Sequence, residues 1–183
     1  MIGIKGFARL GTWCATAVAS VLLVTACGTV RQTAAPALSA ADTVAVAPIA
    51  NYSETPDAGR SAGSIAANAL RASGLANVRV APADASANAM FDTAQGDSIS
   101  KKLEWARAQH VKYVLTGAVE EWRYKAGVDG EPAVGVTFEL LDVSSGLVVW
   151  SATGTRTGWS RSGLSDVATV LIGKVLSPLG AGH

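Results

Sequence analysis

Residues 111–119 read VKYVLTGAV, a nearly continuous apolar run. A strand with one buried face alternates apolar and polar residues, whereas a strand buried on both faces is apolar almost throughout. The run therefore predicts the central strand of a sheet that is covered on both sides. We expect this strand to continue through Glu120, Glu121 and Trp122.

Strand-like and helix-like segments alternate on both sides of this run. Before it, β-branched patterns predict strands over residues 43–49 and 77–81, and helices are expected to begin at Thr55, as N-cap, and at Ser98. After it, residues 133–143 and 147–155 predict a hairpin, and helical spacing of apolar residues continues from Leu164. The order β-α-β-α-β-β-β-α predicts an α/β fold, a three-layer sandwich in which helices flank a mixed β-sheet.

The first 26 residues are typical of a bacterial lipoprotein signal peptide. Lys5 and Arg9 precede an apolar run, residues 10–24, that is too short to span a bilayer comfortably. Val24-Thr25-Ala26-Cys27 then matches the lipobox, in which the cysteine thiol takes a diacylglyceryl group before cleavage. We predict Cys27 as the lipidated first residue of the mature chain; the alternative is an incidental cysteine after an ordinary signal peptide.

The mature chain is expected to be one domain held at a membrane. Cys14 lies inside the signal segment, so neither a disulfide nor thiol chemistry is expected. Gly28, rather than Asp, follows Cys27, which predicts sorting to the outer membrane with the protein on its periplasmic face. Residues 27–41 are rich in Thr, Ala and Pro and predict a flexible tether of about 20 Å. Residues 42–183 are then expected to form a single periplasmic α/β domain.

Charge and chemistry exclude several function classes. Removal of residues 1–26 leaves 13 basic and 14 acidic residues, a formal charge of −1, which argues against a nucleic-acid partner. His110 is expected as a capping or core histidine, and Ser98-Ile99-Ser100-Lys101 lacks the partner motifs of acyl enzymes. Glu120 and Glu121 are adjacent on a strand and should point to opposite faces, so they are not expected to form a catalytic pair. We expect no enzymatic activity, no metal and no cofactor.

Three stretches carry a family resemblance: APIANYSETPDAG at 47–59, EWRYKAGVDGEPAVGV at 121–136, and TGWSRSGLS at 157–165. Together with the lipobox, they resemble the PelC family of outer-membrane lipoproteins, which belong to Pel exopolysaccharide export systems. The resemblance implies a fold similar to the periplasmic domain of TolB and to lipoprotein activators of peptidoglycan synthases. It covers essentially the whole mature chain.

The resemblance also implies a function and its residues. Members are expected to form a homo-oligomeric ring, a dodecamer, beneath an outer-membrane export barrel. There the ring guides a cationic exopolysaccharide toward the pore for biofilm formation. Asp129 and Glu131 match the family's acidic loop, and Trp159 and Arg161 match the loop that faces the membrane. The alternative is an activator of a peptidoglycan synthase, which usually needs a long tether, so the short one expected here speaks against it.

Trp159 stays open to three interpretations on the residues alone. It is surrounded by Gly, Ser, Thr and Arg, and it could fill the core, stack on a sugar or sit against a membrane. The last helix has an apolar stripe without Trp159, and Ser162 is expected to cap that helix. The membrane interpretation is therefore favoured, with the core interpretation as its main competitor.

Overall fold

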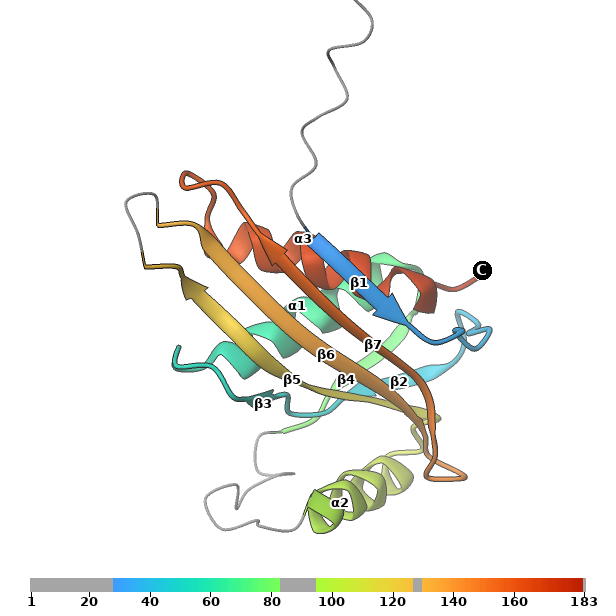
Figure 1. Cartoon of the computed structure of the whole chain (residues 1–183). Helices are drawn as coiled ribbons and strands as arrows, with labels where there is room; N and C mark the ends of the chain where they lie inside the picture. The colour runs from blue at the N-terminus through green and yellow to red at the C-terminus, as the bar shows by residue number, and fades with distance from the viewer. Residues whose placement is uncertain (1–27, 83–94, 127–129, 183) are drawn as a thin grey trace, which may run out of the picture.

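Most of the apolar run, from Tyr113 onward, lies in β5, the long strand Tyr113–Tyr124 near the middle of a seven-stranded sheet (Figure 1). The computed structural model describes residues 28–82, 95–126 and 130–182. The other described strands are β1 Gly28–Gln32, β2 Thr43–Val46, β3 Ala50–Asn51, β4 Asn77–Val80, β6 Pro132–Asp142 and β7 Val148–Thr157. The described helices are α1 Ala58–Ala72, α2 Gln95–Ala108 and α3 Leu164–Leu176, and a short 3-10 helix, Ser177–Leu179, follows α3.

The sheet is mixed, as predicted. Its strand order is β1-β7-β6-β5-β2-β4, and the short β3 pairs with β5. β2 runs parallel to β4 and β5, because helical crossovers connect these strands. β5, β6, β7 and β1 are antiparallel neighbours, and the β5–β6 and β6–β7 pairs are hairpins.

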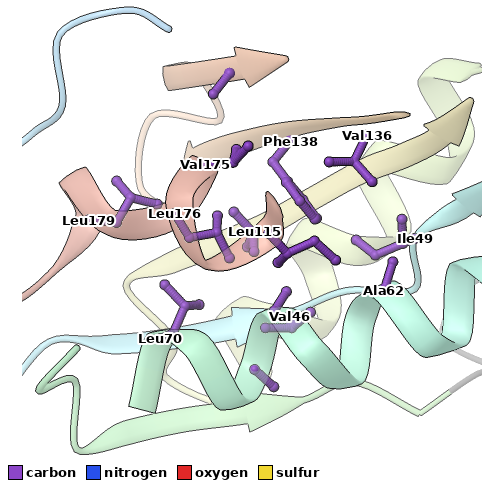
Figure 2. Close-up of a cluster of buried hydrophobic side chains, with 14 of the residues drawn as sticks. Val46, Ile49, Ala62, Leu70, Leu115, Val136, Phe138, Val175, Leu176 and Leu179 are labelled. Atoms are coloured by element: carbon purple, nitrogen blue, oxygen red, sulfur yellow. The ribbon is translucent and has the colours of Figure 1, made fainter. Parts of the chain in front are cut away.

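Helices cover both faces, which confirms the three-layer sandwich. α1 and α3 pack on one face around a cluster that includes Val46, Leu115 and Phe138 (Figure 2). On the other face, α2 packs through Leu103 and Ala106 on a smaller cluster. Residues that are adjacent in sequence along a central strand therefore belong to different clusters. Val114 and Leu115, each 1% exposed or less, explain why the run is continuously apolar.

Among the described residues, α2 covers only part of its face of the sheet, and the remainder is polar. We call this remainder, formed by Thr137, Glu139, Ser151, Thr153 and Thr155, the open face. These side chains alternate along β6 and β7 with residues that point into the core. The hydroxyls of Thr137 and Thr153 are hydrogen-bonded across the strands at 3.1 Å.

The prediction of a flexible tether over residues 27–41 is wrong for the part that the structure describes. β1 begins at Gly28 and pairs with β7, and Leu38 is only 5% exposed. Composition suggested a tether, but the backbone of β7 offers unpaired hydrogen-bonding groups that β1 satisfies. Val30 lies opposite Gly154 and packs against the core. The folded body therefore includes β1 and Leu38, which precede residue 42.

Two predicted helix caps are also wrong. α1 begins at Ala58, and the Thr55 hydroxyl instead donates a hydrogen bond to the backbone carbonyl of Trp122. α3 has Gly163 as its N-cap, without a side-chain cap, so Ser162 does not serve this role. In both cases a favourable residue type stands near the helix start, but the chain enters the helix one or more residues later.

His110 lies beyond the end of α2 and is exposed, so it belongs neither to the helix nor to the core. Its φ of 54° is left-handed, and its backbone N–H donates to the carbonyl of Arg107 at 3.0 Å. The residue therefore ends the helix through its backbone conformation. None of the helices in the described ranges combines the length and the apolar character that crossing a membrane requires.

Candidate functional site

Three segments that the sequence analysis singled out meet at one end of the sheet. Tyr124 pairs with Pro132 where β5 connects to β6, and Ala133 pairs with Thr157 where β7 ends. Gly28, the start of β1, pairs with Arg156. We call this end, formed by the described residues of 124–132, residues 157–164 and Gly28, the loop end (Figure 1).

Hydrogen bonds join the two loops of the loop end to each other. The backbone N–H of Gly158 donates to the carbonyl of Pro132 at 2.8 Å. The Tyr124 hydroxyl accepts a hydrogen bond from the backbone N–H of Leu164 at 3.2 Å. Leu164 is the first residue of α3, so Tyr124 satisfies one of the donors that a side-chain cap would otherwise take. The β5–β6 loop and the β7–α3 loop are therefore held as one unit.

Gly158 lets the second loop approach the core closely. A Cβ at this position would lie 2.5 Å from Cγ2 of Val167 and 3.0 Å from Cγ of Pro132. These distances leave no room for a side chain without movement of α3 or of β6. Gly158, directly after β7, therefore keeps the backbone close to the core immediately before Trp159.

Trp159 is 68% exposed, so the interpretation that it fills the core is wrong for this chain. The backbone N–H of Ser162 donates to the carbonyl of Trp159 at 2.8 Å, which closes a turn over residues 159–162. Arg161 is exposed in the same turn. Tyr124, 53% exposed, is a second aromatic at this end that sequence reasoning missed. Its signal was weak, because a tyrosine at a strand end is also an ordinary sheet residue.

The predicted acidic loop is described in part. Glu131 is exposed, and its carboxylate makes no hydrogen bond or ion pair with the described residues. Its backbone carbonyl accepts a hydrogen bond from the N–H of Lys125 at 2.8 Å, which narrows the base of the loop. Asp129 and the predicted lipidation site Cys27 lie outside the described residues. Gly130 has a φ of +52°, as the turn signal Asp129-Gly130 suggests.

No metal-binding group of three or more His, Cys, Asp or Glu side chains occurs within residues 28–82, 95–126 and 130–182. What the loop end offers instead is an exposed indole, a guanidinium, a phenol and a carboxylate. This combination suits binding to charged or interfacial surfaces more than acid–base chemistry.

A scan against protein-family models and a search of curated proteins each returned no match. Among solved structures, the lipoprotein GNA1162 from Neisseria meningitidis is similar with a TM-score of 0.50 and 18% identity. That match covers 75% of this chain and 97% of the other. At this identity only the fold is shared, and it defines the class: an α/β domain with a mixed sheet and helices on both faces.

Two further structures show the family. The PelC dodecamer from Paraburkholderia phytofirmans is 68% identical, with a TM-score of 0.74, over 86% of this chain and 100% of that chain. A point variant of that PelC, also a dodecamer, is 68% identical with a TM-score of 0.73, over 85% of this chain and 99% of that chain. The chain belongs to the PelC family.

Proposed function

We propose that this protein is a lipid-anchored accessory of Pel-like exopolysaccharide export. It forms a homo-oligomeric ring on the periplasmic face of the outer membrane and guides a cationic polysaccharide toward the export barrel. Family membership supports the Pel-related role and the ring, since both PelC structures are dodecamers. The observation that carries the proposal is the loop end, where the start of β1, Trp159 and the acidic loop come together.

The start of β1 supports a membrane contact at this end. Gly28 is bonded to Cys27 in the sequence and lies opposite Arg156, one residue before the end of β7. A lipid on Cys27 would therefore be attached beside the Trp159 loop. Tryptophan and arginine both suit the membrane–water interface, where an apolar ring and a charged head each find a favourable layer. The lipid and the exposed indole would thus hold the same end of the body against the membrane.

The magnitudes fit a ring better than a single chain. Full burial of a tryptophan side chain would contribute about 4–6 kcal/mol, of which interfacial insertion reaches only a part. Repetition of even a part around a ring would fix its orientation, because linked contacts act together. For the polymer, exposed charge pairs contribute only about 0–1 kcal/mol each. Asp129 and Glu131 would therefore attract a cationic chain without trapping it.

The alternative function, activation of a peptidoglycan synthase at the inner membrane, loses support. Such an activator has to reach across the periplasm from its lipid anchor. The first described residue, Gly28, already belongs to the sheet, so the tether expected over residues 27–41 is not there to supply this reach. No feature of the described residues favours this alternative.

Polymer secretion in a strain that carries the export system tests the proposal. Trp159→Ala and Asp129→Ala should each reduce secreted polysaccharide, because they remove the membrane contact or the guiding charge. We expect both to leave the melting temperature nearly unchanged; for Trp159, which is 68% exposed, a surface substitution usually shifts stability by about 0.5 kcal/mol or less. Leu147→Ala is the control, because Leu147 is 66% exposed at the opposite end of the sheet.

Wild-type secretion with Trp159→Ala would remove the membrane contact from the proposal. Wild-type secretion with Asp129→Ala would remove the guiding role of the acidic loop. An equal loss of secretion with Leu147→Ala would show that the loop end has no special part in export.

A further inference from the structure

Two adjoining cavities lie on the face of the sheet that carries the open face. One has a volume of about 240 Å³ and is lined by residues of β5, β6 and α2, among them Lys102, Thr116 and Glu139. The other, of about 350 Å³, is lined by residues 52–54 and 120–123. Tyr52 and Glu120 line both cavities. We call the two together the groove.

A β-bulge in β5 places the carboxylates of the groove. The register against β6 shifts between Val119 and Glu121, which leaves Glu120 as the extra residue. Val119 and Trp122 both belong to the core cluster under α1 and α3, so both residues between them are directed away from it. Glu120 and Glu121 accordingly line the same cavity. The prediction that they point to opposite faces is wrong, because strict alternation does not hold across a bulge.

The groove is lined by four carboxylates and two cationic side chains, so it carries an excess of negative charge. Arg123 pairs with Glu121 at 3.1 Å. Lys102 donates a hydrogen bond to the Thr116 hydroxyl at 3.2 Å, and burial lowers the pKa of Lys102 while the charge of Glu139 opposes that change. Glu54 and Glu120 make no hydrogen bond or ion pair with the described residues. Among the described residues, these two carboxylates therefore face the groove without a cationic partner.

Tyr52 supplies an aromatic wall that the backbone holds in place. Tyr52 is 68% exposed, and its backbone N–H donates to the carbonyl of Val119 at 2.9 Å. The next turn is fixed by Asn51, whose side-chain oxygen accepts hydrogen bonds from the backbone N–H and the hydroxyl of Ser53. An exposed aromatic ring on a hydrogen-bonded backbone, beside hydroxyls and carboxylates, offers an apolar surface and polar partners together, the combination that small polar ligands require.

From this geometry we propose that the groove binds an amino-sugar unit of a cationic polysaccharide. The sugar ring packs against Tyr52, and its ammonium group lies between Glu54 and Glu120. This inference rests on the proposed function for the presence of such a polymer, and it adds a binding site that is distinct from the loop end. Residues 120–123 line the groove, and Tyr124 of the loop end follows them directly in β5, so the site adjoins the loop end along this strand.

A neighbouring copy of the chain is the competing occupant, since the PelC relatives are dodecamers. The buried centre of a protein–protein interface is depleted of charged residues. The groove is lined by six charged side chains, namely Glu54, Lys102, Glu120, Glu121, Arg123 and Glu139. This composition favours a hydrophilic cationic ligand over a subunit contact.

Saturation-transfer NMR with the non-lipidated protein tests the site, because it detects weak binding to large assemblies. The probes are a glucosamine pentamer and, as matched control, the fully N-acetylated pentamer, which lacks the positive charges. The glucosamine pentamer should bind more tightly. Tyr52→Ala should weaken its binding about 3- to 10-fold, and Glu120→Gln about 2- to 5-fold. Tyr52→Phe, which keeps the ring, should bind like the wild type.

Glu104→Gln is the matched carboxylate control, because Glu104 is exposed on α2 and lines neither cavity. Light scattering on each variant reports the mass of the assembly. Unchanged binding by Tyr52→Ala and Glu120→Gln overturns the inference, as does equal binding of the N-acetylated pentamer. Loss of assembly mass in these variants would assign the groove to a neighbouring copy and overturn it as well.

The binding assay involves neither export nor a membrane, so the two hypotheses can fail separately. If binding follows the expected pattern while deletion of the protein leaves secretion intact, the proposed function falls and the site stands. If the Trp159 and Asp129 variants lose secretion while the groove variants bind normally, the site falls and the function stands.

Discussion

Trp150 and Trp159 lie close together in the sequence, yet their surroundings differ completely. Trp150 is in β7, 1% exposed, and is among the largest fully buried side chains of the described chain. Trp159 stands just beyond the end of the same strand and is 68% exposed. Trp150 belongs to the buried core cluster, whereas Trp159 does not. Trp150 therefore stabilises the fold, whereas Trp159 is held by the fold in an exposed position.

The same contrast separates the two regions around these residues. The strands are fixed by packing from α1 and α3, with Gly154 so close to α3 that a Cβ there would lie 2.6 Å from Val175. The loop end is fixed by backbone hydrogen bonds and by Tyr124, while its Trp159, Arg161 and Glu131 side chains remain exposed. A rigid base with exposed functional groups is what a contact surface requires.

The largest expected effect is the difference in stability between two variants in which Trp150 or Trp159 is replaced by alanine. Trp150→Ala should destabilise the protein by about 3–5 kcal/mol, because it opens a large cavity in the core. For a chain of this size, that corresponds to a fall in melting temperature of roughly 6–20 °C. Trp159→Ala should change stability by about 0.5 kcal/mol or less. Thermal and denaturant unfolding measure both.

Equal losses in the two variants would contradict the comparison. They would mean that Trp159 is buried in the protein in solution, by a neighbouring copy or by a rearranged loop. Protein concentration should therefore be varied, because stability that depends on assembly changes with concentration.

Much of the fold could be predicted from the sequence. The run 111–119 predicted a strand buried on both faces, and the spacing of apolar residues from Leu164 predicted α3, because both signals come directly from side-chain burial. The strand β1 could not be predicted, because its Thr- and Gln-containing segment becomes a strand only through pairing with the edge of β7. The start of α1 was also missed, since Thr55 finds a tertiary partner in Trp122.

The candidate site was predictable only where a resemblance covered it. Glu131 was identified through the family, and Trp159 through its polar surroundings together with the family; both residues are exposed. The groove was missed, because it depends on a bulge at Glu120 that no local pattern signals and on cavities between segments far apart in the sequence. Alternation alone gave the wrong answer for Glu120 and Glu121.

A pair of glycines tests whether the loop end is coupled to the core. Gly158→Ala should destabilise the protein by about 1–3 kcal/mol, since the new Cβ would lie 2.5 Å from Val167 and force α3 or the loop to move. Gly173→Ala is the matched control within α3, where a Cβ meets nothing within 4 Å. That change should stabilise the helix by about 0.5–1 kcal/mol. Unfolding in denaturant separates the two signs.

If Gly158→Ala is as stable as the wild type, the β7–α3 loop moves independently of the core. The boundary between the packed core and the exposed loop would then lie before Gly158, within β7. The fluorescence lost when Trp159→Phe is added to this variant, compared with the loss in the wild type, would isolate Trp159 from the other tryptophans and report whether its surroundings have changed.

The smallest expected effect is a dependence on pH that comes from the end of the sheet opposite the loop end. Lys112 donates a hydrogen bond to Asp42 at 2.8 Å, and this contact, with the backbone N–H of Ser39, lowers the pKa of Asp42 from its ordinary 3.8. Asp142 has its pKa lowered by hydrogen bonds from the Ser144 hydroxyl and the Ser145 backbone in the β6–β7 turn. Asp42 directly precedes β2, and Asp142 is the last residue of β6 and lies opposite Tyr113, the first residue of β5.

The sign follows from the two lowered pKa values. Each carboxylate binds protons less readily in the folded chain than in the unfolded chain, so its contribution is complete above pH 3.8 and is lost as the pH falls through the folded-state pKa. Unfolding measured from pH 6 to pH 2 should therefore show a loss of stability below about pH 4 that Asp142→Asn reduces. Glu104→Gln is the control and should keep the wild-type profile in this range. An unchanged profile in Asp142→Asn would show that the carboxylate of the β6–β7 turn contributes nothing to stability. The sensitivity to acid would then have to come from the Asp42–Lys112 pair or from the loop end.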